Sequence, residues 1–158
     1  MVTRLAPEAR SLFKTAEAQA RGSRSPLIEA EHLLLAMCAC PDTDAGQVLV
    51  SFGLTPAALQ EALDQEFVAS LAAAGVFVST GSLGRPSPRP RRHLRLSASS
   101  KAAMERAVTA AAGSGRIRPG HLLLGVLGTR VGTVPRTLHF AGVDQAELTA
   151  RTEQALAA

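Results

Sequence analysis

The chain has 158 residues, of which 46% are hydrophobic and 19% are charged, a composition typical of a folded globular protein and not of a disordered one. No apolar run approaches the ~20 residues that a membrane-spanning helix needs, and the N-terminus holds no apolar signal core, so we expect a cytoplasmic protein without membrane contact. The net charge is +4, and the excess of positive charge lies in one stretch, namely Arg85, Arg89, Arg91, Arg92 and Arg95.

The first half of the chain predicts four helices, over residues 7–20, 29–40, 44–52 and 56–67. Pro7 suits the first position of the first helix, whose apolar residues recur at three- and four-residue spacing. The second helix is apolar nearly all round, so it should be buried at the centre. Gly53 ends the third helix, and Thr55 caps the fourth. The apolar stripe of the fourth helix is Ala58, Leu59, Ala62, Leu63 and Phe67.

The repeat is interrupted from about residue 68 to residue 93. The apolar run 72–78 is expected to pack back onto the first half. Residues 80–92 combine alternating prolines with glycines and arginines, which predicts an irregular linker that trypsin cuts first.

The second half predicts four more helices, over residues 98–112, 121–127, 134–141 and from 145 onward. Ser97 is the cap of the first, and Gly142 stops the third. Asp144 and Glu147 have the spacing of a capping box at the start of the fourth.

The two halves repeat each other. The segment Glu31-His32-Leu33-Leu34-Leu35-Ala36 returns as Gly120-His121-Leu122-Leu123-Leu124-Gly125, and at the same offset Leu49 matches Leu138, Gly53 matches Gly142 and Leu59 matches Leu148. Each half has too little core to fold alone. We therefore predict an all-α fold, in which two four-helix repeats related by a pseudo-twofold axis pack as one domain.

These repeated elements resemble the Clp N-terminal (Clp repeat) domain, which stands at the front of ClpC/ClpA-type AAA+ unfoldases. The matching pieces are Arg4-Leu5, Glu31-His32-Leu33-Leu34 and Phe52-Gly53-Leu54 in the first half, and Arg95-Leu96-Ser97, His121-Leu122-Leu123-Leu124-Gly125 and Ala141-Gly142-Val143 in the second. The resemblance divides the chain into repeat 1 (1–70), a linker (71–93) and a degenerate repeat 2 (94–158). No phosphate loop of an ATPase occurs in the sequence, so the chain is either a free-standing Clp-repeat protein or a piece of an unfoldase. The long Pro/Arg-rich linker and the degenerate second repeat favour a free-standing, actinobacterial-type member.

The resemblance implies a non-enzymatic protein- or peptide-binding module of the Clp proteolytic system. Such a module recognises substrates or adaptors of a ClpC-type unfoldase, or acts as its regulator or decoy. Some family members bind phosphorylated arginine at one site per repeat, and the matching residues here are Arg4, Glu31 and His32. Because Gly120 replaces the acid in repeat 2 and follows a proline, at most one site is expected, in repeat 1.

Each of these residues also has a purely structural interpretation. Glu31 can be a solvated first-turn acid that favours the helix dipole. His32 and His121 can be structural histidines that bond neighbouring backbone. No serine stands in a nucleophile motif, so no enzyme is expected.

The resemblance implies a second surface, between the starts of the two repeats, where adaptors and cyclic-peptide antibiotics bind. The aligned residues here are Val2, Leu5, Leu96 and Lys101. The alternative is that Leu5 and Leu96 are core residues across the pseudo-twofold interface.

The arginine-rich stretch leaves an alternative function open, which is binding of nucleic acid or of an acidic partner. The chain has no Trp or Tyr and five Phe, which argues against binding of single strands by base stacking. Cys38 and Cys40 are too few for a disulfide framework, and no second Cys/His pair stands at zinc spacing. We therefore expect no metal and no cofactor.

Overall fold

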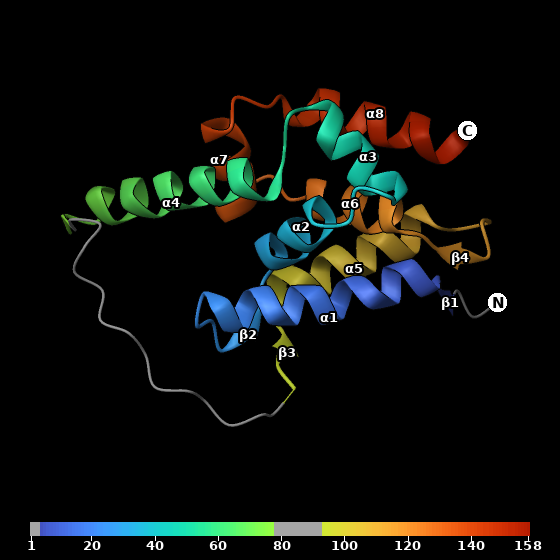
Figure 1. Ribbon diagram of the computed structural model, residues 1–158, viewed down its shortest axis with the longest axis horizontal. Coiled ribbons are helices and arrows are strands. Elements are labelled where there is room, and N and C mark those ends of the chain that lie inside the picture. The colour runs from blue at the N-terminus through green and yellow to red at the C-terminus, as the bar shows by residue number, and fades with distance from the viewer. Residues whose placement is uncertain (1–3, 78–92) are drawn as a thin grey trace.

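The computed structural model describes residues 4–77 and 93–158 and shows eight helices in them (Figure 1). Repeat 1 contributes α1 (Pro7–Gly22), α2 (Ala30–Cys38), α3 (Asp44–Ser51) and α4 (Pro56–Ala73). Repeat 2 contributes α5 (Ala98–Ala110), α6 (Pro119–Leu127), α7 (Thr133–Phe140) and α8 (Gln145–Ala157). The all-α prediction of two four-helix repeats in one domain is confirmed. Val2 and the predicted linker segment 80–92 lie outside the described residues.

The helix ends are formed by the residues that the sequence indicates. The side chains of Thr55 and Ser97 accept backbone N–H bonds at 3.2 Å from the residues three positions on, and Asp144 caps α8 in the same way. Gly53 and Gly142 end the equivalent helices α3 and α7 with φ of +73° and +70°, a conformation that side chains disfavour.

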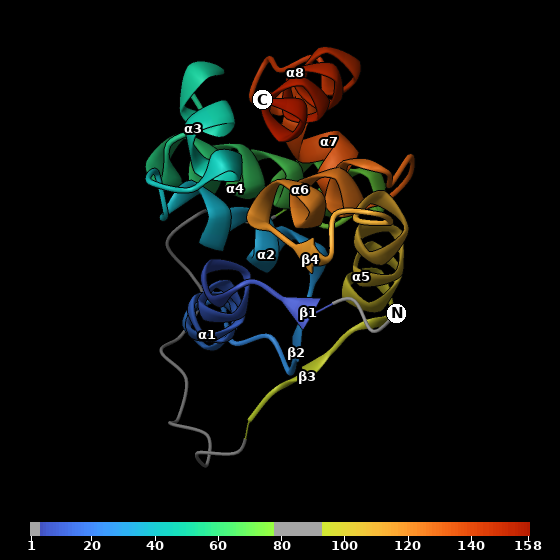
Figure 2. The same cartoon turned by 90° about the vertical axis from the view of Figure 1, so that its right-hand side faces the viewer.

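Four two-residue strands join the repeats, and the sequence did not predict them. β1 (Arg4–Leu5) pairs in parallel with β4 (Arg116–Ile117), and β2 (Leu27–Ile28) pairs in parallel with β3 (Arg95–Leu96). Each ladder thus takes one strand from each repeat (Figure 2), and the pseudo-twofold relation exchanges the two ladders. Two residues are too few to show the alternation of a strand.

The core is continuous across the repeats and is centred on α2 and α6. Leu34 of α2 and Leu123 of α6 are equivalent in the repeat, and both are completely buried. Helix α2 packs on α1, and α6 packs on α5, so each repeat covers its own central helix. Because α2 and α6 also contact each other, neither half closes a core by itself.

Helix α4 crosses from repeat 1 to pack on α7 of repeat 2 (Figure 1). It continues to Ala73 because no helix breaker precedes Gly75, whose φ is +80°. Val76 and Phe77 follow it with 47% and 87% of their surface exposed. The expectation that the run 72–78 packs back onto the first half is therefore wrong for the residues described.

Candidate functional site

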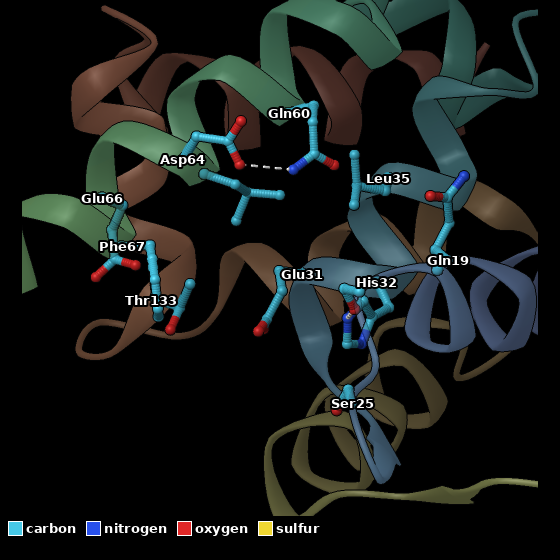
Figure 3. Close-up of a pocket in the computed structure, with 13 residues that line it drawn as sticks. Gln19, Ser25, Glu31, His32, Leu35, Gln60, Asp64, Glu66, Phe67 and Thr133 are labelled. Carbon is cyan, nitrogen blue, oxygen red and sulfur yellow. Dashed lines mark hydrogen bonds between the residues drawn. The ribbon is translucent and has the colours of Figure 1, made fainter. Parts of the chain in front are cut away.

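A cavity of about 580 Å³ lies where the end of α1, the start of α2 and the middle of α4 meet (Figure 3). We call it the α2 pocket. Its wall combines carboxylates with apolar side chains, among them Glu31, Leu35, Leu63, Asp64, Glu66 and Phe67. Phe67, which the stripe pattern assigned to the buried face of its helix, is 52% exposed at this pocket. The pocket thus offers a charged group and an apolar surface to the same bound side chain.

Glu31 projects from the first turn of α2 into the α2 pocket (Figure 3). Burial raises the pKa of its carboxyl group, and the nearby charges of Glu29 and Glu66 raise this pKa further. Within the part of the chain that the structure describes, no cation forms an ion pair with it. The pocket therefore holds a carboxylate whose charge nothing described compensates.

His32 has both ring nitrogens engaged in holding the turn between α1 and α2. Its Nδ1 accepts the N–H of Glu29 at 2.9 Å, which assigns the proton to Nε2; Nε2 then donates to the Ser23 hydroxyl at 2.9 Å. Burial lowers the pKa of the ring. His121 accepts the N–H of Arg118 at 3.0 Å in the same way. The two histidines thus cap the starts of the equivalent helices α2 and α6. His32 also lines the α2 pocket, as an uncharged ring.

The N-terminus of α2 is already filled by oxygen atoms of the chain itself. The N–H of Ala30 donates to the Ser99 hydroxyl at 3.1 Å, and that hydroxyl donates to Glu29 at 2.8 Å. The N–H of His32 bonds to the carbonyl of Glu29 at 3.1 Å. A helix start offers such N–H groups to a phosphate, and those of Ala30 and His32 already have partners within the chain.

The equivalent position in repeat 2, at the start of α6, is closed. The N–H of Gly120 donates to the Asp44 carboxylate at 2.8 Å, and Arg118 lies 3.6 Å from the other oxygen of that carboxylate. Leu156 of α8 covers the spot, because a Cβ on Gly120 would come within 2.8 Å of its side chain. The sequence suggested a lost site through Gly120, but nothing in it indicated that Asp44 fills the position.

The structure does not bring Arg4 to Glu31. Arg4 pairs with Arg116, in the strand that leads to α6, whereas Glu31 starts α2 at the other end of α1. A helix of 16 residues separates the two ends by roughly 24 Å. The residue that the ladders place beside the approach to α2 is Arg95, opposite Leu27. In the sequence, Arg4 groups with Glu31 because both lie in repeat 1, but the strand that holds Arg4 pairs with a strand of repeat 2.

Three of the four residues expected at the inter-repeat surface lie in the described part of the chain. Leu5 and Leu96 are half-buried, lie in different ladders and pack against the core. Lys101 is exposed on α5, and Val2 lies outside the described residues. A docking surface formed by these residues remains a prediction.

An ion pair between the buried Glu66 and the half-exposed Arg136, which the sequence did not reveal, borders the α2 pocket. Arg136 of α7 donates to the Glu66 carboxylate of α4 at 2.7 Å, and Ser70 donates to the same oxygen at 2.5 Å. The Glu66 side chain is 6% exposed. In the sequence, Glu66 cannot be told apart from the exposed acids of the same helix. Its partner Arg136 comes near only because α4 packs on α7.

Three further features concern residues 4–77 and 93–158: metal sites, membrane-spanning helices and the Cys38 thiol. No group of three His, Cys, Asp or Glu side chains there could hold a metal ion, and none of the helices is long and apolar enough to cross a membrane. Burial raises the pKa of the Cys38 thiol to about 12, so this thiol stays protonated at neutral pH. Of the arginine-rich stretch, only Arg95 lies in the described part.

Comparison with known proteins gives a family and a fold. The family model of the Clp repeat (R) N-terminal domain matches residues 4–116. No curated protein matches the sequence. The N-terminal domain of the caseinolytic protease-associated chaperone ClpD from Arabidopsis thaliana is similar in structure, with a TM-score of 0.73, 20% identity and coverage of 100% of this chain and 98% of that one.

Two further solved structures are similar. The Hsp104 N-terminal domain from Candida albicans gives a TM-score of 0.67 at 12% identity, covering 94% of this chain and 89% of that one. A chain from a structural study of the ATPase ClpV, the TssB-TssC sheath and the accessory HsiE protein gives a TM-score of 0.59 at 21% identity, covering 98% of this chain and 90% of that one. At these identities the structures show the fold alone. The match of the family model over most of the chain shows more: the chain belongs to the Clp repeat (R) N-terminal domain family.

Proposed function

We propose that the chain is a non-enzymatic recognition module of a Clp-type unfoldase system, and that it binds substrates or adaptors through the α2 pocket. Clp N-terminal domains are interaction modules of Clp unfoldases, which supports a protein partner. The observation that carries the proposal is the asymmetry of the repeats. Repeat 1 keeps an open cavity at the start of its central helix, and repeat 2 fills the same position with Asp44 and Leu156.

The lining of the α2 pocket suits a side chain of a bound polypeptide. Leu35 and Leu63 give it an apolar wall, and the half-exposed ring of Phe67 can bury further surface when a partner docks. Helices α2 and α4 form most of the wall together with the end of α1 and the turn after it, and the Glu66–Arg136 ion pair ties α4 to α7. Because most of the lining residues lie on helices, binding orders little additional backbone, which keeps its entropic cost low.

Two finer hypotheses belong to this proposal and remain to be tested. The module regulates or decoys a ClpC-type unfoldase by competing for the same partners. If it binds phosphoarginine, it does so at one site, in repeat 1, because the start of α6 in repeat 2 already holds the Asp44 carboxylate.

The test is capture of partners from the native cytosol on the immobilised full chain, with identification by mass spectrometry. We expect the wild type to retain an unfoldase, its adaptors or its substrates, and Phe67→Ser to retain much less of them. Val68→Ser is the matched control, because Val68 is the next residue of α4, is 40% exposed and does not line the α2 pocket. Equal retention by the two variants, or no Clp component in any eluate, would contradict the proposal.

A further inference from the structure

A second hollow lies between the C-terminal half of α4 and helix α7, and we call it the α4–α7 groove. Its volume is about 390 Å³. Its apolar walls come from both helices and are formed by Ala69, Ala73, Pro135 and Phe140. Besides His139, the ionisable residues that line it are Glu66 and Arg136, and these two form an ion pair with each other. The groove therefore offers a partner an apolar surface in which the one pair of opposite charges is already satisfied.

The fold itself does not require an apolar groove at this place, as the equivalent place in the other half of the molecule shows. By the offset of the repeat, the α4–α7 groove corresponds to a hollow between α3 and α8. That hollow is lined by Ser51 where the α4–α7 groove has Phe140, and by Gln47 where it has Arg136. Phe140 leaves 41% of its surface exposed. A large apolar side chain that packing does not demand, at an exposed hollow, is typical of a surface that contacts a partner.

Helix α4, which forms one wall of this groove, ends close to an exposed aromatic side chain. Gly75 closes the helix with a φ of +80°, and the N–H of Val76 donates to the carbonyl of Leu71 at 2.8 Å. Phe77 follows directly and is 87% exposed, so it does not fill the groove of its own chain. In Figure 1 the C-terminal end of α4 extends beyond α7. A ring and a groove that can receive a ring thus lie on the same accessible end of the molecule.

The ring and the groove are spaced so that two copies of the chain can exchange them. If the ends of two α4 helices pack antiparallel about a twofold axis near Ala74, residue 77 of one copy lies opposite residue 71 of the other. Residue 71 stands between Ala69 and Ala73 of the groove wall. Such a contact is isologous, because each copy gives one ring and one groove.

The charges favour a second copy over a charged partner. The chain has a net charge of +4, so two copies repel each other in most orientations. At this end, however, residues 67–77 include no charged side chain, and the Glu66–Arg136 pair is neutral as a whole. An acidic or a basic segment would meet only His139 as an ionisable group of the lining that is not already paired. Antiparallel packing of two copies therefore brings no like charges together here.

We propose that two copies of this chain associate through the ends of their α4 helices, with Phe77 of each copy seated in the α4–α7 groove of the other. The proposal goes beyond recognition of Clp partners, because the groove and the α2 pocket share only Glu66 among their lining residues. A fully buried aromatic side chain covers about 150–250 Å², and each seated ring covers a similar area of groove wall, so the dimer buries on the order of 800 Å². This is below the roughly 1,600 Å² of a standard interface, so the dimer is weak and depends on concentration.

Sedimentation velocity of the full chain between about 10 µM and 1 mM tests the proposal. We expect the weight-average mass of the wild type to rise with concentration from that of one chain toward that of two. Phe77→Ser should raise the dissociation constant at least about tenfold. Because Phe77 is exposed, this substitution leaves the core intact, which circular dichroism verifies. Val131→Ser is the matched control and should associate as the wild type does, because Val131 is 82% exposed and does not line the groove.

A second variant tests the seating of the ring in the groove. Phe140→Ser gives the groove the residue type of its counterpart Ser51 and should also weaken self-association. A mixture of Phe77→Ser and Phe140→Ser restores one of the two contacts, because the first variant keeps an intact groove and the second keeps Phe77. The mixture should therefore associate more strongly than either variant alone, which a nonspecific apolar contact does not produce.

A wild type with the mass of one chain at every concentration would overturn the proposal. Equal loss of association in Val131→Ser and Phe77→Ser, or a mixture that associates no more strongly than its components, would overturn it as well. A wild type that stays monomeric and loses Clp partners through Phe77→Ser would assign the groove to such a partner instead of a second copy. Retention of Clp partners by Phe67→Ser bears on the α2 pocket alone, so the two proposals fail independently.

Discussion

The packing of α5 on α6 in repeat 2 can be tested at Gly125, because the backbones of the two helices come into direct contact there. A Cβ built on Gly125 would lie 2.1 Å from the carbonyl oxygen of Ala103. The contact is reinforced by Arg106, which donates to the carbonyl of Gly125 at 2.7 Å and to Thr129 at 2.8 Å. The substitution Gly125→Ala therefore forces α5 away from α6, since a backbone atom cannot rotate aside.

The magnitude follows from two opposing effects. Replacing a helical glycine by alanine stabilises a helix by about 1 kcal/mol. Ordinary van der Waals contact begins near 3.4 Å, so α5 must retreat by more than an ångström, and overpacking of a well-packed core costs about 1–3 kcal/mol or more. We expect Gly125→Ala to lower the free energy of unfolding by about 2 kcal/mol, a large part of the stability of a small domain.

Gly22→Ala is the matched control, because Gly22 is also helical and a Cβ there would meet nothing within 4 Å. It should be neutral or stabilise by up to about 1 kcal/mol. Urea unfolding followed by circular dichroism measures both, with the slope of the transition checked for constancy. If Gly125→Ala proves as stable as Gly22→Ala, the close approach of α5 and α6 is wrong.

Three further predictions concern the core and the pocket. Leu34→Ala and Leu123→Ala should each cost about 2–5 kcal/mol, and a loss below about 1 kcal/mol in urea unfolding would mean that α2 or α6 is not central. The pKa of Glu31 is raised in the folded state, so the wild type should lose stability as the pH rises from the ordinary carboxyl pKa to the raised pKa. Glu31→Gln should lack this loss, and parallel profiles of stability against pH for the two proteins would refute the prediction. Arg136→Met should destabilise the fold by about 1–3 kcal/mol, because it leaves the Glu66 carboxylate buried with only Ser70, and thermal unfolding that matches the wild type would show the ion pair to be dispensable.

Much of the fold can be read from the sequence because its signals are local. The recurrence of His32 at His121 marks the two central helices, and caps such as Thr55 and Ser97 act on backbone only three residues away. Gly53 and Gly142 stop helices through their own φ angles. Such features do not depend on which element lies next to them in space.

The candidate site could be predicted only in part, because it depends on contacts between the halves. The family resemblance indicated Glu31 as a site residue and Gly120 as its loss in repeat 2, and the structure places Glu31 in a pocket. The position of Arg4 beside Arg116, the burial of Glu66 and the occupation of the α6 start by Asp44 all arise where a segment of one repeat crosses onto the other. No spacing within either repeat encodes these contacts.

The measurement that tests the central claim most directly is degradation of a model substrate by a ClpC-type unfoldase with its peptidase, in the presence of increasing amounts of this chain. If the α2 pocket recognises partners of the Clp system, an excess of the wild type and of Val68→Ser should slow degradation, because the chain competes for the partners, and Phe67→Ser should not. A degradation rate that the wild type leaves unchanged at every concentration, or that Phe67→Ser slows equally, would contradict the claim.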